Sequence, residues 1–265
     1  MSTRVPVKIE ANPWAELRRF TDARIALGRV GASLPTEDVL KFGLAHAMAR
    51  DAVHAALDPA ALTSALAPLG LPCLEVHSQA PDRPSYLLRP DLGRMLHPDA
   101  ATGLRARNSS CDIAIVLADG LSAVATQAHA APLLAALLPQ CHPAWTLAPL
   151  LIARQARVAL GDDIGEALHA RLVLVLIGER PGLSSPDSLG AYLTFNPRRG
   201  RNDAERNCVS NIRPAGLSYA EAARKISWLM GEALSRQLTG VELKDDSDVP
   251  ALPGPQSNGL NLAQS

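Results

Sequence analysis

Two adjacent charges stand at the end of a strongly apolar run, in the sequence IGERPG. Glu179 and Arg180 follow residues 171–178, and Pro181-Gly182 permits a tight turn directly afterwards. A carboxylate in such a loop accepts hydrogen bonds from amide or ionic groups, and a guanidinium donates them. The same two side chains could instead form a simple ion pair, worth only about 0–1 kcal/mol when exposed. Ligand binding and a structural ion pair therefore stand as equal alternatives.

Three further sites combine polar or reactive side chains with a loop position. Asp119-Gly120 follows an apolar run at 111–118, and segment 154–158 follows a second such run. Cys208 lies in RNCVSN, between charged and amide side chains. Each site also has a plainer interpretation, because an aspartate can cap a helix and a lone cysteine is more often an inert thiol than a nucleophile. We treat all three as candidates.

The hydrophobic pattern predicts the elements that position these residues. Unbroken apolar runs at 111–118, 145–154 and 171–178 alternate with segments of helical spacing, and 189–197 is expected to be a fourth strand. Strands that are apolar throughout are buried on both faces, which favours an α/β fold with a parallel sheet between layers of helices. Ligands bind beyond the carboxyl ends of such strands, so the candidate loops should share one edge of the sheet.

Three regions are expected along the chain: a mainly helical N-terminal domain at 1–100, a sheet domain at 101–243 and a disordered tail at 244–265. Within the first region we expect helices at 14–28, 36–57 and 58–70. Brief extended segments are expected at 74–78 and 85–90. The last helix of the sheet domain should begin at the capping box Ser218–Glu221 and end at Gly240.

The composition excludes several classes of protein. The 26 basic and 26 acidic residues balance, which argues against a nucleic-acid binder or an anionic-membrane binder. No apolar run reaches the roughly 18 residues of a membrane span. Four dispersed cysteines without a signal peptide indicate reduced thiols in the cytoplasm, and no metal site is indicated. Common dinucleotide, phosphate, serine-hydrolase and zinc-peptidase motifs are absent from the sequence.

Six segments resemble the small (light) subunit of ethanolamine ammonia-lyase, in the order of that family and over residues 12–243. They are TDARIALGRVG, YLLRPDLGRML, DIAIVLADGLSAVA, RQARVALGDDIGEAL, IGERPGLSSPDSLGAYLTFNPR and DAERNCVSNIRPAGLSYAEAA. The G-E-R-P-G-L and N-C-x-S-N-I blocks are long and unusual, which makes the resemblance specific.

The resemblance implies one subunit of an adenosylcobalamin-dependent lyase that converts ethanolamine to acetaldehyde and ammonia. In that family the large subunit holds the substrate in a β/α barrel, and the small subunit covers the cobalamin with a Rossmann-like domain. The family's cobalamin-contacting positions correspond here to Val158 in R-V-x-x-x-D, Glu179 in G-E-R-P-G and Cys208 in R-x-C-x-S-N. No catalytic residue or metal ligand of this chain is implied. Packaging inside a bacterial microcompartment is left open.

Two other functions stay open at this point. The chain could be a stand-alone small-molecule enzyme with Cys208 as its nucleophile. It could also be a structural protein in which Glu179 and Arg180 merely pair. The arginine-rich segment 198–201 is more typical of a solvated loop than of a phosphate site.

Overall fold

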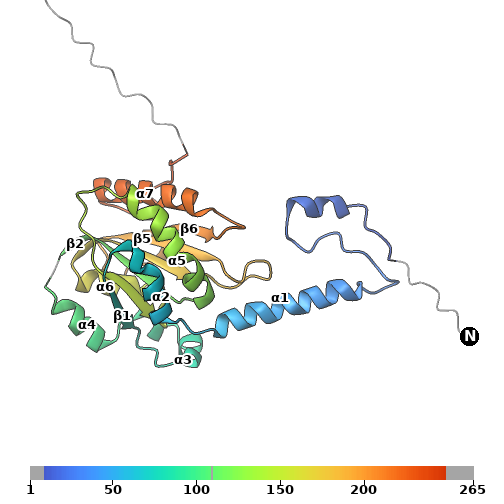
Figure 1. The fold of residues 1–265 in the computed structure, drawn as a ribbon, viewed down its shortest axis with the longest axis horizontal. Helices are drawn as coiled ribbons and strands as arrows, with labels where there is room; N and C mark the ends of the chain where they lie inside the picture. The colour runs from blue at the N-terminus through green and yellow to red at the C-terminus, as the bar shows by residue number, and fades with distance from the viewer. Residues whose placement is uncertain (1–8, 109, 249–265) are drawn as a thin grey trace, which may run out of the picture.

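The protein is a mixed α/β structure built on one six-stranded sheet (Figure 1). The computed structural model describes residues 9–108 and 110–248. The strands lie in the order β1-β3-β2-β4-β5-β6. Their bounds are β1 Cys73–His77, β2 Cys111–Ala118, β3 Leu150–Arg154, β4 Ala170–Gly178, β5 Leu189–Phe195 and β6 Asn207–Ile212.

Helices cover both faces of the sheet, as the unbroken apolar runs predict. One core joins the sheet to α2, α5 and α7, and a second core joins the opposite face to α4 and α6. Successive residues of β2 alternate between them, since Leu117 belongs to the first core and Val116 to the second. The helices are α1 Thr36–His54, α2 Pro59–Leu66, α3 Arg83–Leu88, α4 Pro98–Arg105, α5 Ala123–Leu137, α6 Leu160–Ala167 and α7 Tyr219–Arg236.

The expectation of a wholly parallel sheet is wrong at its last two strands. Strands β1, β3, β2 and β4 run parallel, but β5 pairs antiparallel with both β4 and β6. Residues 179–188 alone join β4 to β5, and a parallel crossover needs a dozen or more residues. The sequence analysis missed β6, because its polar residues lie at the edge of the sheet and lack a continuous apolar run.

The N-terminal region contributes to the same sheet. Strand β1 was expected as an extended segment, and it forms the edge of the sheet with Val76 in register with Ala153 of β3. The sheet therefore includes part of the region predicted to be a helical domain, and the domain boundaries stay predictions. The predicted extended segment at 85–90 is wrong: the Asp82 carboxylate accepts a hydrogen bond from Ser85 N at 2.8 Å and caps α3.

Residues 9–54, which we call the N-terminal arm, extend away from the sheet (Figure 1). The expected helix at 14–28 is reduced to a single 3-10 segment, η1 Ala15–Phe20. The expected helix at 36–57 is present as α1. In the C-terminal half, α7 begins at the predicted capping box but ends at Arg236, because Gln237 adopts a left-handed conformation before Gly240 is reached.

The predicted disordered tail lies largely outside the described residues. Its first part, 244–248, is described and contacts α7. Lys225 pairs with Asp245 at 3.2 Å and with Asp248 at 2.6 Å, so these residues are tied to the body of the protein by charge.

Candidate functional site

The carboxyl ends of β2, β3 and β4 meet at one edge of the sheet and border a cavity of about 420 Å³. Ala118 at the end of β2 is in register with Ala153 of β3 and Ile177 of β4. The prediction that the candidate loops share one edge is therefore confirmed. The lining residues are Tyr86, Gly120, Leu121, Arg157, Val158, Ile177, Gly178, Glu179, Arg180 and Tyr192.

The floor of the cavity is formed where two glycine-containing loops cross. Leu121 N donates to the carbonyl oxygen of Gly178 at 3.0 Å, and Gly120 has a φ of 56°. A Cβ atom at position 178 would lie 1.9 Å from the carbonyl oxygen of Ser122. Only a residue without a side chain allows the two backbones to approach this closely.

Asp119 anchors the loop that carries Val158. Its carboxylate accepts hydrogen bonds from Gln155 N at 2.8 Å and Ala156 N at 2.9 Å. The side chain is buried, and burial raises the pKa of its carboxyl group, against the opposing effect of these hydrogen bonds. Asp119 is thus not a cap of the following helix: Ser122 caps α5.

We expect Asp119→Asn to lower the free energy of unfolding by about 1–3 kcal/mol, because the amide NH2 group would face one of the two backbone donors and leave it without an acceptor. Chemical denaturation of the purified chain measures this change. The matched control is Asp91→Asn, since Asp91 forms an exposed ion pair with Arg89 and its loss should leave stability nearly unchanged. Equal effects of both variants would contradict the anchoring role.

A tyrosine enclosed by two arginines forms one wall of the cavity. The guanidinium carbons of Arg83 and Arg157 lie 4.7 and 4.6 Å from the centroid of the Tyr86 ring. Burial raises the pKa of Tyr86 to about 12, so its hydroxyl stays protonated and donates to the carbonyl oxygen of Ala156 at 3.2 Å. Within the described part of the chain, the buried Nε of Arg157 has no acceptor. Sequence analysis missed Tyr86, because nothing in YLLRP marks an aromatic ring that distant arginines enclose.

Glu179 is half-buried and held by donors from two other segments. The hydroxyl groups of Ser188 and Ser210 donate to its carboxylate, and Asn211 N donates at 3.3 Å. No ion pair joins Glu179 to Arg180 among residues 9–108 and 110–248, so the structural-pair alternative has no support. With one donor on Oε1 and two on Oε2, the carboxylate keeps an acceptor position on Oε1.

The loop between Glu179 and β5 is fastened along its length. The Ser122 hydroxyl donates to the carbonyl oxygen of Pro186 at 2.8 Å. One residue further, the Asp187 carboxylate contacts His129 Nε2 at 3.3 Å, and the other ring nitrogen of His129 lies 2.8 Å from the Tyr219 hydroxyl. These contacts fix the loop that follows Glu179 to α5 and α7.

Cys208 lies beside the cavity and is connected to it through Tyr192. The two residues are directly opposite on β6 and β5, where their side chains share one face and the thiol and hydroxyl interact. Helix α6 packs on β2 and β4, and α7 packs on the other face of β5 and β6, so Cys208 is exposed. Although exposed, the thiol is desolvated by nearby protein atoms, which raises its pKa, as does the charge of Glu179.

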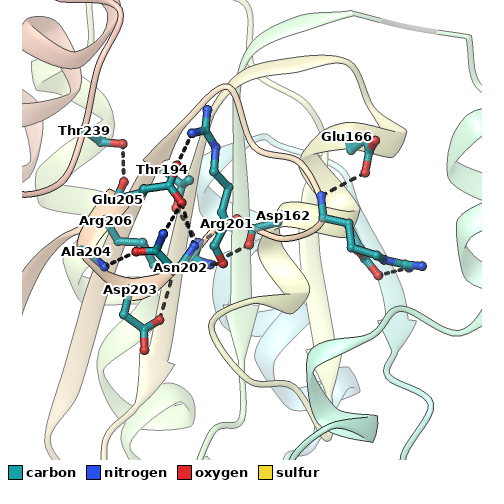
Figure 2. A network of polar contacts seen from close by, with 12 residues as sticks. Asp162, Glu166, Thr194, Arg201, Asn202, Asp203, Ala204, Glu205, Arg206 and Thr239 are labelled. Atoms are coloured by element: carbon teal, nitrogen blue, oxygen red, sulfur yellow. Dashed lines mark hydrogen bonds and ion pairs between the residues drawn. The ribbon is translucent and has the colours of Figure 1, made fainter.

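The arginine-rich segment is only partly a solvated loop. Arg199 pairs with Asp163 at 2.6 Å, and Arg201 pairs with Glu205. Figure 2 shows the adjoining network, in which Arg206 makes two hydrogen bonds to Asp162, at 2.7 and 2.6 Å. The side chains of Arg206 and Asp162 are each 2% exposed. They belong to the same motifs as Cys208 and Val158, so a buried ion pair joins the two motifs.

Between residues 9 and 248, residue 109 aside, no group of three or more His, Cys, Asp or Glu side chains could hold a metal ion. Over the same ranges, no helix has the length and apolar character needed to cross a membrane.

Comparison with known proteins places the chain in a family. Residues 11–244 match the family described as ethanolamine ammonia-lyase light chain (EutC). The chain belongs to this light-chain family. A protein of Azotobacter vinelandii named ethanolamine ammonia-lyase small subunit is 57% identical over an alignment of 268 positions, which covers 99% of this chain and 98% of that protein. Proteins of the same name from Pseudomonas fluorescens and Xanthomonas campestris pv. campestris are each 54% identical, covering 93% and 95% of this chain and 92% and 94% of their own lengths.

The expected resemblance is thus confirmed, and the light-chain motifs can be placed in space. Val158 and Glu179 line one cavity, and Cys208 lies next to it across the Tyr192 ring. The three motif positions come from segments up to 50 residues apart, and the fold gathers them at one corner of the sheet.

Proposed function

We propose that the chain is the small subunit of an adenosylcobalamin-dependent ethanolamine ammonia-lyase, and that Val158, Glu179 and Cys208 contact the cobalamin. With its large subunit it would convert ethanolamine to acetaldehyde and ammonia, and the substrate would bind at the large subunit. Family membership supports the choice of enzyme. The observation that carries the cofactor site is the convergence of the three motif positions at one corner of the sheet.

The donors and acceptors of this corner suit a corrin ring, whose rim carries amide side chains. Such amides have both N–H donors and carbonyl acceptors. The acceptor position of Glu179 that no described residue fills can take an amide N–H, and the exposed guanidinium of Arg180, another lining residue, can donate to an amide carbonyl. The exposed Cys208 and the half-buried Tyr192 lie beside them.

The size of the cavity supports a shared site. A volume of about 420 Å³ falls in the range that encloses a drug-sized ligand, and a cobalamin is considerably larger. This chain would therefore hold one edge of the ring, and the opposite side would be completed by the large subunit. When bound, adenosylcobalamin supplies the radical chemistry by homolysis of its cobalt–carbon bond. The residues of this chain would bind and orient the ring and help exclude water from it.

Reconstitution tests the proposal. The chain is co-expressed with a large subunit of ethanolamine ammonia-lyase, mixed with adenosylcobalamin and separated from free cofactor by gel filtration. We expect the complex to retain a corrinoid absorbance spectrum and to deaminate ethanolamine, and the isolated chain to do neither. Full activity of the isolated chain, or a complex that never retains corrinoid, would refute the proposal.

Within this complex, Glu179→Ala should raise the dissociation constant for adenosylcobalamin about 10- to 100-fold. A hydrogen bond to a charged group contributes about 1.5–3 kcal/mol, and each 1.4 kcal/mol is a factor of ten. Equilibrium binding followed by absorbance measures the change. Glu75→Ala is the matched control, because Glu75 is an exposed residue of β1 at the far edge of the sheet. Unchanged affinity in Glu179→Ala would remove this residue from the site.

The alternative of a stand-alone enzyme with Cys208 as nucleophile has less support. A nucleophilic cysteine needs its thiolate, which a neighbouring base or positive charge stabilises. The groups that act on Cys208 are the Tyr192 hydroxyl and the Glu179 carboxylate, and the pKa of the thiol is raised. Loss of turnover on alkylation of the isolated chain would favour this alternative.

The free cysteines support a cytoplasmic location.

A further inference from the structure

The N-terminal arm exposes an apolar surface that the other described residues, 55–108 and 110–248, do not cover. Fifteen large apolar side chains are exposed among the described residues, and eleven of them fall between Ile9 and Met48. The most exposed of these are Trp14, Phe20, Leu40 and Leu44, at 67, 72, 67 and 63%. Single exposed apolar residues are normal, but a concentration of this kind marks an interaction surface.

The amount of apolar surface suits a stable interface. With exposed fractions from 38 to 72%, the eleven side chains present on the order of 1,000 Å², above the roughly 800 Å² that each partner buries in a standard specific interface. The arm therefore has enough surface to bind a protein partner tightly.

The distribution of these side chains indicates a partner that surrounds the helix. Successive helical residues are turned by about 100°, so Phe42 and Leu44 point about 200° apart on α1. Ala52 near the end of α1 is its one buried residue. Exposed apolar side chains on opposite sides of α1 can be covered together only by elements on more than one side of the helix, whereas pairing with a second copy of the same helix would cover a single stripe. The geometry favours a large enclosing partner over self-association.

The arm is joined to the cofactor corner at two points. Between η1 and α1, Arg24 donates to the carbonyl oxygen of Leu183, in the loop that follows Glu179. At the base of the arm, Arg83 donates to the carbonyl oxygens of Val53 in α1, at 2.7 Å, and Gly120 in the cavity floor, at 2.8 Å. The arm and the open side of the cavity therefore form one continuous surface, available to one partner.

From these observations we propose that the arm, residues 9–54, is a principal docking surface for the large subunit of ethanolamine ammonia-lyase, continuous with the side of the cofactor cavity that this subunit completes. The inference rests on the proposed function for the identity of the partner. Docking of the arm would also set the position of the cavity floor, because Arg83 bonds both.

The test is assembly of the complex without cobalamin. Leu40→Asp/Leu44→Asp places two charges on adjacent turns of α1, where both side chains are already exposed, so the isolated chain should fold as before in circular dichroism and thermal denaturation. We expect at least a 100-fold increase in the dissociation constant for the large subunit, measured by biolayer interferometry and native mass spectrometry. The control Leu88→Asp/Val241→Asp changes two side chains outside the arm that are more exposed than Leu40 and Leu44, and it should bind normally.

The outcomes separate this inference from the function on which it rests. If the unaltered chain binds no large subunit, the proposed function fails. If the unaltered chain binds and the arm variant binds equally well, only the docking surface is wrong. If the arm variant instead converts a self-associated chain to a monomer while its affinity for the large subunit is unchanged, the arm is a contact between copies of this chain and the inference is overturned.

Discussion

Arg206→Met should destabilise the protein by about 3–5 kcal/mol, because it leaves the Asp162 carboxylate buried without its partner. Both side chains are 2% exposed, so water cannot replace the lost guanidinium. Arg206 also donates to the Thr194 hydroxyl at 2.9 Å and to the carbonyl oxygen of Arg201 at 3.0 Å, and these acceptors would lose a donor as well. Urea denaturation of the isolated chain measures the free energy of unfolding.

Two further variants isolate the cause of this effect. Asp203→Asn removes the second carboxylate near Arg206. The side chain of Asp203 is 94% exposed, so this variant should change stability little. Arg206→Met/Asp162→Leu removes both buried charges and should regain much of the stability, since apolar replacement of a whole buried pair is often neutral. A double variant as unstable as the single one would mean that packing, and not the unpaired charge, causes the loss.

Gly178→Ala should destabilise the protein by about 3 kcal/mol and abolish retention of cobalamin by the reconstituted complex. The new methyl group would lie 1.9 Å from the Ser122 carbonyl oxygen and 2.8 Å from that of Asp119, so backbone must move. Overpacking costs about 1–3 kcal/mol, and we expect the upper end because the obstacle is backbone rather than a flexible side chain. The displaced loops are those that border the cavity.

Gly103→Ala is the matched control for this substitution. Gly103 lies in α4, and a Cβ atom there would meet no atom within 4 Å. The same change should therefore stabilise the chain by about 0.4–1 kcal/mol, because alanine favours the helix. Thermal denaturation of both variants and corrinoid retention of both complexes complete the test. A Gly178→Ala complex that retains cobalamin normally would show that the crossing is not needed for the site.

Much of the site could be predicted from local sequence. The apolar runs ending at Ala118 and Gly178 placed their loops at one edge of the sheet, because strands buried on both faces are characteristic of parallel sheets. The capping box at Ser218 likewise located the start of α7. The same reasoning failed for α3, although Asp82 and the following proline carried a start signal, because the segment was interpreted as a turn.

The remainder depended on contacts between distant residues. The direction of β5 follows from the length of the loop between β4 and β5. The apolar pattern of β5 is the same for either direction. Tyr86 gained its place in the cavity wall from Arg157, 71 residues further along the chain. The partners Arg206 and Asp162 are separated by 44 residues, and no local pattern indicates which charges will be buried together.

The reversal of chain direction at β5 has an architectural consequence. Had the chain continued in parallel, its return path would have needed a crossover helix, and in this kind of fold such helices blanket the faces of the sheet. A hairpin needs no such cover, so on this face of the last two strands Cys208 stays exposed and Tyr192 is only half-buried. A broad, disc-shaped molecule can lie against this face without any helix being displaced to admit it.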